Sequence, residues 1–209
     1  MQHSGAMPLQ NRVLPTGQIV ADPNRGTLTG NRGIIHGPDK ELSTKRWTHH
    51  AWISCVLDWQ GRRRDVMSGR KWTELFFLDE AVALAAGHRP CGYCRRADYA
   101  AFKMAWERAF DGPVSAKGMD RVLHPARVAP RTREQVTFQA SARNLPDGAM
   151  YMLRGATYLR FGDQAFEFDP SGYSAPRLLH QGTVDVLTPK PIVEVLRAGY
   201  RPRLHPTVR

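Results

Sequence analysis

Hydrophobic and polar residues alternate over residues 51–59, a pattern typical of a half-buried β-strand. Successive side chains of a strand point to opposite faces, so alternate residues share one face. The residues expected on one face are Ala51, Ile53, Cys55, Leu57 and Trp59. A Gln-Gly turn follows, and we expect a hairpin with three consecutive arginines, residues 62–64, near its tip.

Helical patterns dominate the next stretch and the end of the chain. Asp79 is a good N-cap for a helix that Gly87 ends. Residues 95–110 place aromatic side chains three or four positions apart, which predicts a second helix with one apolar face directed into the core. A final helix is expected over residues 188–199, with Pro191 early and Gly199 at its end.

These patterns divide the chain into four regions. Residues 1–44 form a β-rich N-terminal arm. Residues 45–111 hold all five tryptophans and all three cysteines. Residues 112–143 are expected to be a linker with one short helix around Met119–Leu123. Residues 144–209 form a β-rich region that ends in the final helix.

Composition bears on partners and compartment. The 209 residues carry a formal net charge of +11, which favours a polyanionic partner, most commonly nucleic acid. No apolar run approaches the roughly 18 residues of a membrane span, and the first residues lack a signal-peptide pattern. We therefore expect a cytoplasmic protein without a membrane partner. The sequence leaves open its oligomeric state and whether residues 1–6 are native.

Two of the three cysteines, Cys91 and Cys94, form a Cys-x-x-Cys turn between the first two expected helices. An odd number of cysteines argues against a disulfide framework. A redox pair of this type normally follows a strand of a βαβ unit, which the pattern lacks. Two thiolates at this spacing suit tetrahedral zinc, so we predict a zinc site.

Zinc requires four ligands, and Cys55 is the natural third. The fourth must come from another residue type, because no cysteine remains. We favour His49, which has the same strand parity as Cys55, although the chain would have to bend between them. His88, three residues before Cys91, is the alternative and could instead face a substrate.

Residues 76–98 resemble the second half of the Ada-type zinc module, found in the bacterial DNA methyl-phosphotriester repair protein and attached to some nucleases. Matching positions include the aromatic pair Phe76 and Phe77, Gly87 and the Arg-Pro-Cys-x-x-Cys core at residues 89–94. The resemblance, which covers about residues 47–98, implies a zinc module that acts in DNA repair or processing. It departs at Cys55, which lacks a neighbouring cysteine, and at His88, which replaces an aromatic residue.

The fold expected is therefore α+β, with small antiparallel sheets at both ends and a central zinc-bound helical module. The function predicted is zinc-dependent binding of nucleic acid, DNA rather than RNA. Basic residues flanking the cysteines would contact phosphates. They are Arg62, Arg63, Arg64, Arg70, Lys71, Arg89, Arg95 and Arg96.

Two other classes of function remain open. The first is an enzyme acting on nucleic acid, with Cys55 as a zinc-activated alkyl acceptor or with His88 and either Glu74 or Asp79 in a hydrolase. The second is a structural zinc protein that binds another protein through the β-rich C-terminal region.

Overall fold

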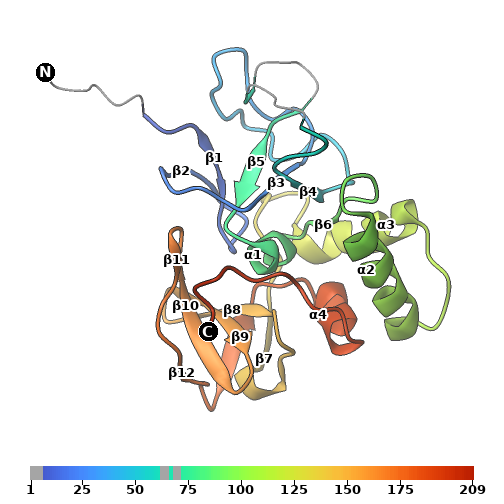
Figure 1. The fold of residues 1–209 in the computed structure, drawn as a ribbon, viewed down its shortest axis with the longest axis vertical. Helices are drawn as coiled ribbons and strands as arrows, with labels where there is room; N and C mark the ends of the chain where they lie inside the picture. The colour runs from blue at the N-terminus through green and yellow to red at the C-terminus, as the bar shows by residue number, and fades with distance from the viewer. Residues whose placement is uncertain (1–6, 62–65, 68–71) are drawn as a thin grey trace, which may run out of the picture.

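The computed structural model describes residues 7–61, 66–67 and 72–209 (Figure 1). Within these ranges the chain forms four α-helices and two mostly antiparallel sheets, which confirms the predicted α+β class. The first sheet lies above the second in Figure 1, and helices α2, α3 and α4 lie together on one side.

The first sheet has six strands in the order β2-β1-β5-β3-β4-β6. Its strands are β1 (Gln10–Val13), β2 (Ile19–Ala21), β3 (Leu28–Asn31), β4 (Ile53–Val56), β5 (Leu75–Phe77) and β6 (Arg89–Pro90). Pairing is antiparallel except for β1 with β5 and β4 with β6. The predicted boundary at residue 44 therefore runs through a single sheet, because β1 and β3 pair with strands that follow it.

The second sheet has the order β11-β10-β9-β8-β13-β7, and β12 also pairs with β10. Its strands are β7 (Phe138–Ser141), β8 (Met150–Leu153), β9 (Ala156–Phe161), β10 (Gln164–Asp169), β11 (Gly172–Tyr173), β12 (Arg177–Leu178) and β13 (Thr183–Val186). A short 3₁₀ helix, Ala142–Asn144, follows β7. Apart from β7, the strands of this sheet lie in the β-rich C-terminal region, residues 144–209, that the sequence predicts.

Three helices begin and end close to their predicted limits. They are α1 (Glu80–Ala85), α2 (Arg96–Ala109) and α4 (Lys190–Arg197). The Asp79 side chain accepts a hydrogen bond from the Val82 backbone N–H at 2.9 Å, as expected of an N-cap. All six residues of α1 are buried, and α1 lies between the two sheets in Figure 1.

The stretch 112–143 is not the linker that the sequence analysis predicts. It contains the twelve-residue helix α3 (Ala116–Arg127), capped by the Ser115 side chain, and strand β7. Met119 and Leu123 of α3 are fully buried in a hydrophobic cluster with residues of α2 and α4. The helix is therefore part of the core, although its charged residues make the segment resemble a loop.

The C-terminal residues cross α1 and are held there by hydrogen bonds. The backbone N–H of Arg203 donates to Glu80 Oε2 at 3.0 Å, and that of His205 donates to Asp79 Oδ2 at 3.0 Å. Tyr200 is buried and donates through its hydroxyl to Glu80 Oε1 at 2.5 Å. The carboxylates at the start of α1 thus anchor the end of the chain.

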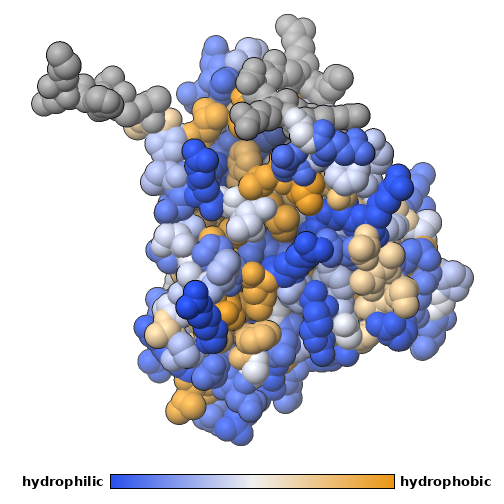
Figure 2. Space-filling view, viewed as in Figure 1, coloured by the Kyte–Doolittle hydropathy of each residue, from blue (hydrophilic) through white to orange (hydrophobic). Residues whose placement is uncertain are grey.

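Hydrophilic side chains cover most of the face seen in Figure 2. Hydrophobic side chains gather in its upper half, over the first sheet, and others lie in its lower half, over the second sheet. Among the described residues, no helix is both long and apolar enough to cross a membrane.

Candidate metal centre

One face of the first sheet carries the first cysteine. The register places Cys55 of β4 opposite Thr29 of β3, and Thr29 opposite Phe76 of β5, so these side chains form a row across the sheet. Two positions along, Ile53 lies opposite Asn31. The alternation predicted for residues 51–59 therefore holds over β4, and it directs Cys55 away from the core.

The opposite face of β4 points into the protein. Trp52 and Ser54, which alternate with Cys55, are 3% and 0% exposed. Strand β6 lies beside β4, and Ser54 is opposite Pro90. This parallel pair is short, but it connects the strand that holds Cys55 directly to the turn that holds the other two cysteines.

That turn begins where β6 ends. The Cys91 N–H donates to the Ser54 carbonyl at 2.9 Å, and the Arg95 N–H donates to the Cys91 carbonyl at 3.1 Å as α2 begins. The Arg89 N–H also donates to β4, to the Trp52 carbonyl at 3.2 Å, so Pro90, which has no N–H, lies between two residues that bond to the sheet. The Cys-x-x-Cys turn is thus fixed by the sheet on one side and by a helix on the other.

The three cysteine side chains converge on one point. The Sγ atoms of Cys55, Cys91 and Cys94 all lie within 4.8 Å of one another. Sulfur ligands at about 2.3 Å from a tetrahedral ion would lie roughly 3.8 Å apart, so the spacing suits a metal. All three cysteines are free, without a disulfide.

The surroundings of the sulfur atoms favour a thiolate. The backbone N–H of Tyr93 donates to Cys91 Sγ at 3.4 Å. Hydrogen bonds from the Cys55 and Cys94 thiols lower the pKa of Cys91 well below its usual range, while the same contacts raise the pKa of Cys55. A cluster that holds one sulfur deprotonated is suited to bind a soft cation.

Neither histidine proposed as the fourth ligand joins this cluster. The His49 side chain is exposed, and its backbone carbonyl accepts a hydrogen bond from Trp52 Nε1 at 3.1 Å. Strand β4 begins only at Ile53, so strand parity does not extend back to His49. The prediction that His49 completes the metal shell is therefore wrong in this structure.

His88 lies on the core face of the sheet, away from the sulfur atoms. Its ring is 0% exposed and packs against Trp52 and Phe77, with centroids 5.3 Å and 4.7 Å away. Burial and the neighbouring Arg32 and Arg127 lower the pKa of His88 well below its usual range. His88 is therefore a neutral core residue here, neither a metal ligand nor exposed to a substrate.

This position also removes the hydrolase pairs built on His88. Asp79 is buried at the start of α1, where it caps the helix. Glu74 lies on the other side of the sheet, and its Oε2 accepts from the Met67 N–H at 2.8 Å. The structure does not bring His88 together with either carboxylate.

Two of the predicted phosphate contacts are internal ion pairs. Arg89 is 5% exposed and donates to both carboxylate oxygens of Asp120, at 2.8 and 2.7 Å. Arg95 is 3% exposed and pairs with Glu80 at 2.8 Å and Asp98 at 3.0 Å. Buried arginines that bind carboxylates cannot reach a phosphate, so these two predictions are wrong.

The other predicted contacts fall into two groups. Arg96, the first residue of α2, is exposed and lies two residues after Cys94. The remaining five basic residues lie outside the part of the chain that the structure describes. They are Arg62, Arg63, Arg64, Arg70 and Lys71.

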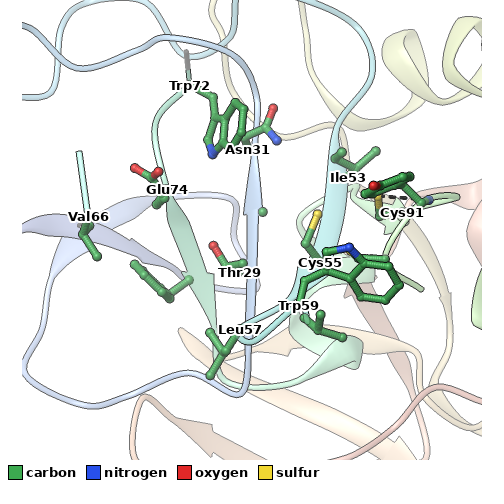
Figure 3. A pocket seen from close by; sticks show the side chains of 15 residues that line it. Thr29, Asn31, Ile53, Cys55, Leu57, Trp59, Val66, Trp72, Glu74 and Cys91 are labelled. Carbon is green, nitrogen blue, oxygen red and sulfur yellow. Dashed lines mark hydrogen bonds between the residues drawn. The ribbon is translucent and has the colours of Figure 1, made fainter. Parts of the chain in front are cut away.

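A cavity of about 550 Å³ opens beside the cysteines. Figure 3 shows Cys55 and Cys91 toward one end of it and Glu74 and Val66 toward the other, with Thr29 between. Aromatic side chains make up much of the wall. They are Trp59, Trp72, Phe76 and Tyr93.

The sequence analysis did not find this wall, because its residues come from three separate segments that only the fold brings together. Trp59 and Tyr93 approach each other at 5.6 Å between ring centroids, which links the end of β4 to the cysteine turn. The clustering of tryptophans in residues 45–111 was the one available signal.

We found no match to this chain among protein-family models, curated proteins or solved structures.

Proposed function

We propose that Cys55, Cys91 and Cys94 bind one zinc ion. Support comes from three free thiols, one in β4 and two in the turn after β6, from the N–H donor at Cys91 Sγ, and from the preference of zinc for thiolate ligands. The cytoplasm, where we propose that the protein acts, keeps such thiols reduced.

The described residues supply three ligands and leave one position of a four-coordinate ion without a protein ligand. All three cysteines line the cavity, so we place that position on the cavity side. A zinc ion with an open position supplies a Lewis acid to whatever molecule occupies the cavity.

We further propose that the cavity receives an unstacked base of a nucleic acid, DNA rather than RNA. The single observation that carries this proposal is the meeting of a three-thiol centre with an aromatic-walled cavity. Aromatic side chains bind bases by stacking, and Tyr93 is 57% exposed at the cavity edge. The net charge of +11 and the exposed Arg96 favour a polyanion. The resemblance to the Ada-type module agrees with this proposal.

Metal analysis of purified variants tests the centre. We expect the wild-type protein to hold one zinc per chain and Cys55→Ser, Cys91→Ser and Cys94→Ser each to lose it. His49→Ala and His88→Gln should retain zinc, which makes them matched controls. Each variant is first checked for a cooperative thermal transition, so that loss of metal is read only from folded protein. Zinc retained by Cys55→Ser would contradict a shared site.

Fluorescence anisotropy with a labelled single-stranded DNA oligonucleotide tests the cavity. Tyr93→Ala should weaken binding on the order of 5- to 150-fold, the loss expected for one stacked base. Phe161→Ala is the matched control, because Phe161 is also exposed but lies in the second sheet. Equal effects of the two substitutions, or no binding by the wild type at low salt, would overturn the proposal.

The salt dependence of the same binding tests Arg96. Each phosphate contact to a single strand contributes about 0.7 to the slope of log affinity against log salt. We expect Arg96→Ala to reduce the slope by about that amount. Arg177→Ala, which removes an exposed arginine of the second sheet, should leave it unchanged.

A second candidate function is alkyl transfer to Cys55, favoured by the position of its sulfur in the cavity. The thiolate would form an S–C bond as the C–O bond of a methyl phosphotriester breaks, leaving a phosphodiester anion. Mass spectrometry after incubation with methylated DNA should then find one added methyl group on Cys55. An unmodified Cys55 would reject alkyl transfer and leave the binding proposal intact.

A further inference from the structure

A second cavity, of about 450 Å³, is lined by residues of the first sheet, the end of α3 and the segment before β7. It is lined by four arginines and one acidic residue. They are Arg32, Arg46, Arg127, Arg133 and Glu134. The cavity also includes Trp52, whose side chain points away from Cys55, so it is distinct from the cysteine cavity.

Two of these arginines stack on Trp52. The guanidinium carbons of Arg32 and Arg127 each lie 4.1 Å from the centroid of the indole ring. Arg32 is 3% exposed and Arg127 is 2% exposed. Cation–π contacts hold the two guanidinium groups in place, but they do not neutralise their charge.

The hydrogen bonds of the two buried arginines go to neutral acceptors. Arg32 donates from Nε to His88 Nε2 at 3.2 Å and from Nη1 to the Gly17 carbonyl at 3.3 Å. Arg127 donates from Nη1 to the Gly87 carbonyl at 2.8 Å and from Nη2 to the His50 carbonyl at 2.6 Å. Arg32 Nη2 and Arg127 Nε are buried without any hydrogen-bond partner among the described residues.

No carboxylate of the described residues forms an ion pair with either group. Asp120 lies near enough to act electrostatically on Arg127, but both its oxygens bind Arg89. Burial lowers the pKa of Arg32 and of Arg127 to about 9, so both stay charged at neutral pH. Burying charge without a counter-charge is costly, which makes a retained uncompensated pair evidence for a ligand.

We infer that this cavity binds the dianionic phosphate group of a small phosphate monoester, with Arg32 and Arg127 as its main ligands. Four arginines face a single carboxylate, so a doubly charged group balances the site better than a singly charged one. Arginine forks match phosphate oxygens in geometry. The unpartnered Arg32 Nη2 and Arg127 Nε supply donors that no protein group satisfies.

The remainder of the ligand also has room. The cavity exceeds the size of a phosphate group, and Ile19, Met152 and Leu187 give it apolar walls. Internal phosphates of a nucleic acid carry one charge each and lie on the outside of the strand. They are poorly matched to guanidinium groups that are almost fully buried, so we place a terminal phosphate of a small molecule here.

Thermal unfolding with inorganic phosphate tests the inference, with chloride at equal ionic strength as reference. At roughly 100 times the dissociation constant, phosphate should raise the Tm of the wild-type protein by about 5 °C or more. Arg32→Gln and Arg133→Gln should each weaken phosphate binding, on the order of 10- to 100-fold for Arg32. Arg177→Gln, in the second sheet, is the matched control and should respond as the wild type does.

Arg32→Gln also disturbs His88, so Arg133→Gln provides a second reading at the exposed edge of the cavity. The inference is overturned if both variants respond to phosphate as strongly as the wild type. A larger response to succinate than to phosphate would also overturn it, because the site would then select a dicarboxylate.

Displacement of phosphate by DNA without terminal phosphates would assign the cavity to nucleic-acid binding and reject a small-molecule site. Zinc content should not change in any of these variants, so this test is independent of the metal centre.

Discussion

Arg89 and Arg95 lie beside the cysteine turn, whereas Arg32 and Arg127 lie on Trp52 in the second cavity, and none of the four is more than 5% exposed. The first pair binds carboxylates, Arg89 through Asp120 and Arg95 through two acidic residues. Among the residues that the structure describes, the second pair donates hydrogen bonds only to backbone carbonyls and histidine nitrogens. The two pairs are therefore equally buried, but only the first pair has its charge balanced by carboxylates of the described residues.

We infer from this difference that the first pair stabilises the fold and that the second pair binds a ligand. Guanidinium groups that meet carboxylates inside the protein fix the turn that carries Cys91 and Cys94, and their charge is unavailable to a ligand. Guanidinium groups without carboxylates carry an uncompensated charge that a bound anion would balance. From their charge alone, the sequence analysis predicted that Arg89 and Arg95 contact phosphates. Their ion pairs with carboxylates contradict that prediction.

The largest effect is expected at Asp120. Asp120→Ala leaves Arg89 buried without its counter-charge, so we expect a loss of about 3–5 kcal/mol in the free energy of unfolding. Urea unfolding at pH 7 measures it. Glu134→Ala, which removes the acidic residue of the second cavity, is the matched control and should change stability by less than about 0.5 kcal/mol, because Glu134 is exposed. Similar losses in both variants would mean that the two regions do not differ as described.

Asp79, the N-cap of α1, is a buried acidic residue. Burial raises the pKa of Asp79 to about 6, although it accepts backbone hydrogen bonds from Val82 and His205. A carboxyl whose pKa is higher in the folded protein than in the unfolded chain favours the protonated fold. The stability it contributes is therefore full below about pH 4 and is lost as pH rises through about 6.

We expect the wild type to lose about 2–3 kcal/mol between pH 4 and pH 7 relative to Asp79→Asn. Urea unfolding of both proteins across this range gives the difference, and other titrating groups cancel in it. A difference that does not vary with pH would show that Asp79 ionises in the folded protein as it does in the unfolded chain.

Local signals in the sequence were enough to predict most of the elements that hold the candidate metal centre. Asp79 and Gly87 bracket α1 because a cap and a left-handed glycine act on their immediate neighbours. The Cys-x-x-Cys turn was recognised from its own spacing, and the alternation around Cys55 gave its face. Convergence of the three sulfur atoms follows from one pairing, β4 with β6, which the sequence did not show.

Properties that depend on distant partners were not predictable. His88 and Arg89 resembled exposed site residues, but the sheet directs one to the core and α3 supplies the partner of the other. Helix α3 was predicted only as a short helix around Met119–Leu123 within a linker, since its buried residues are interrupted by charged ones. The second cavity was missed because Arg32 and Arg127 are 95 positions apart, and only the fold shows that they share Trp52.

The smallest effect is expected at Gly87. A Cβ added there would lie 2.5 Å from Cδ of Arg127, and the residue has φ +79°. Gly155 has φ +83° with no atom within 4 Å of such a Cβ, so Gly155→Ala measures the backbone cost alone, about 1 kcal/mol. Gly87→Ala should cost roughly 1 kcal/mol more and should weaken the phosphate response, because Arg127 must move from Trp52.

Zinc content should stay at the wild-type level in both variants, since Arg127 does not contact the cysteines. Equal unfolding midpoints, with an unchanged phosphate response in Gly87→Ala, would show that the position of Arg127 is not what makes the second cavity an anion site.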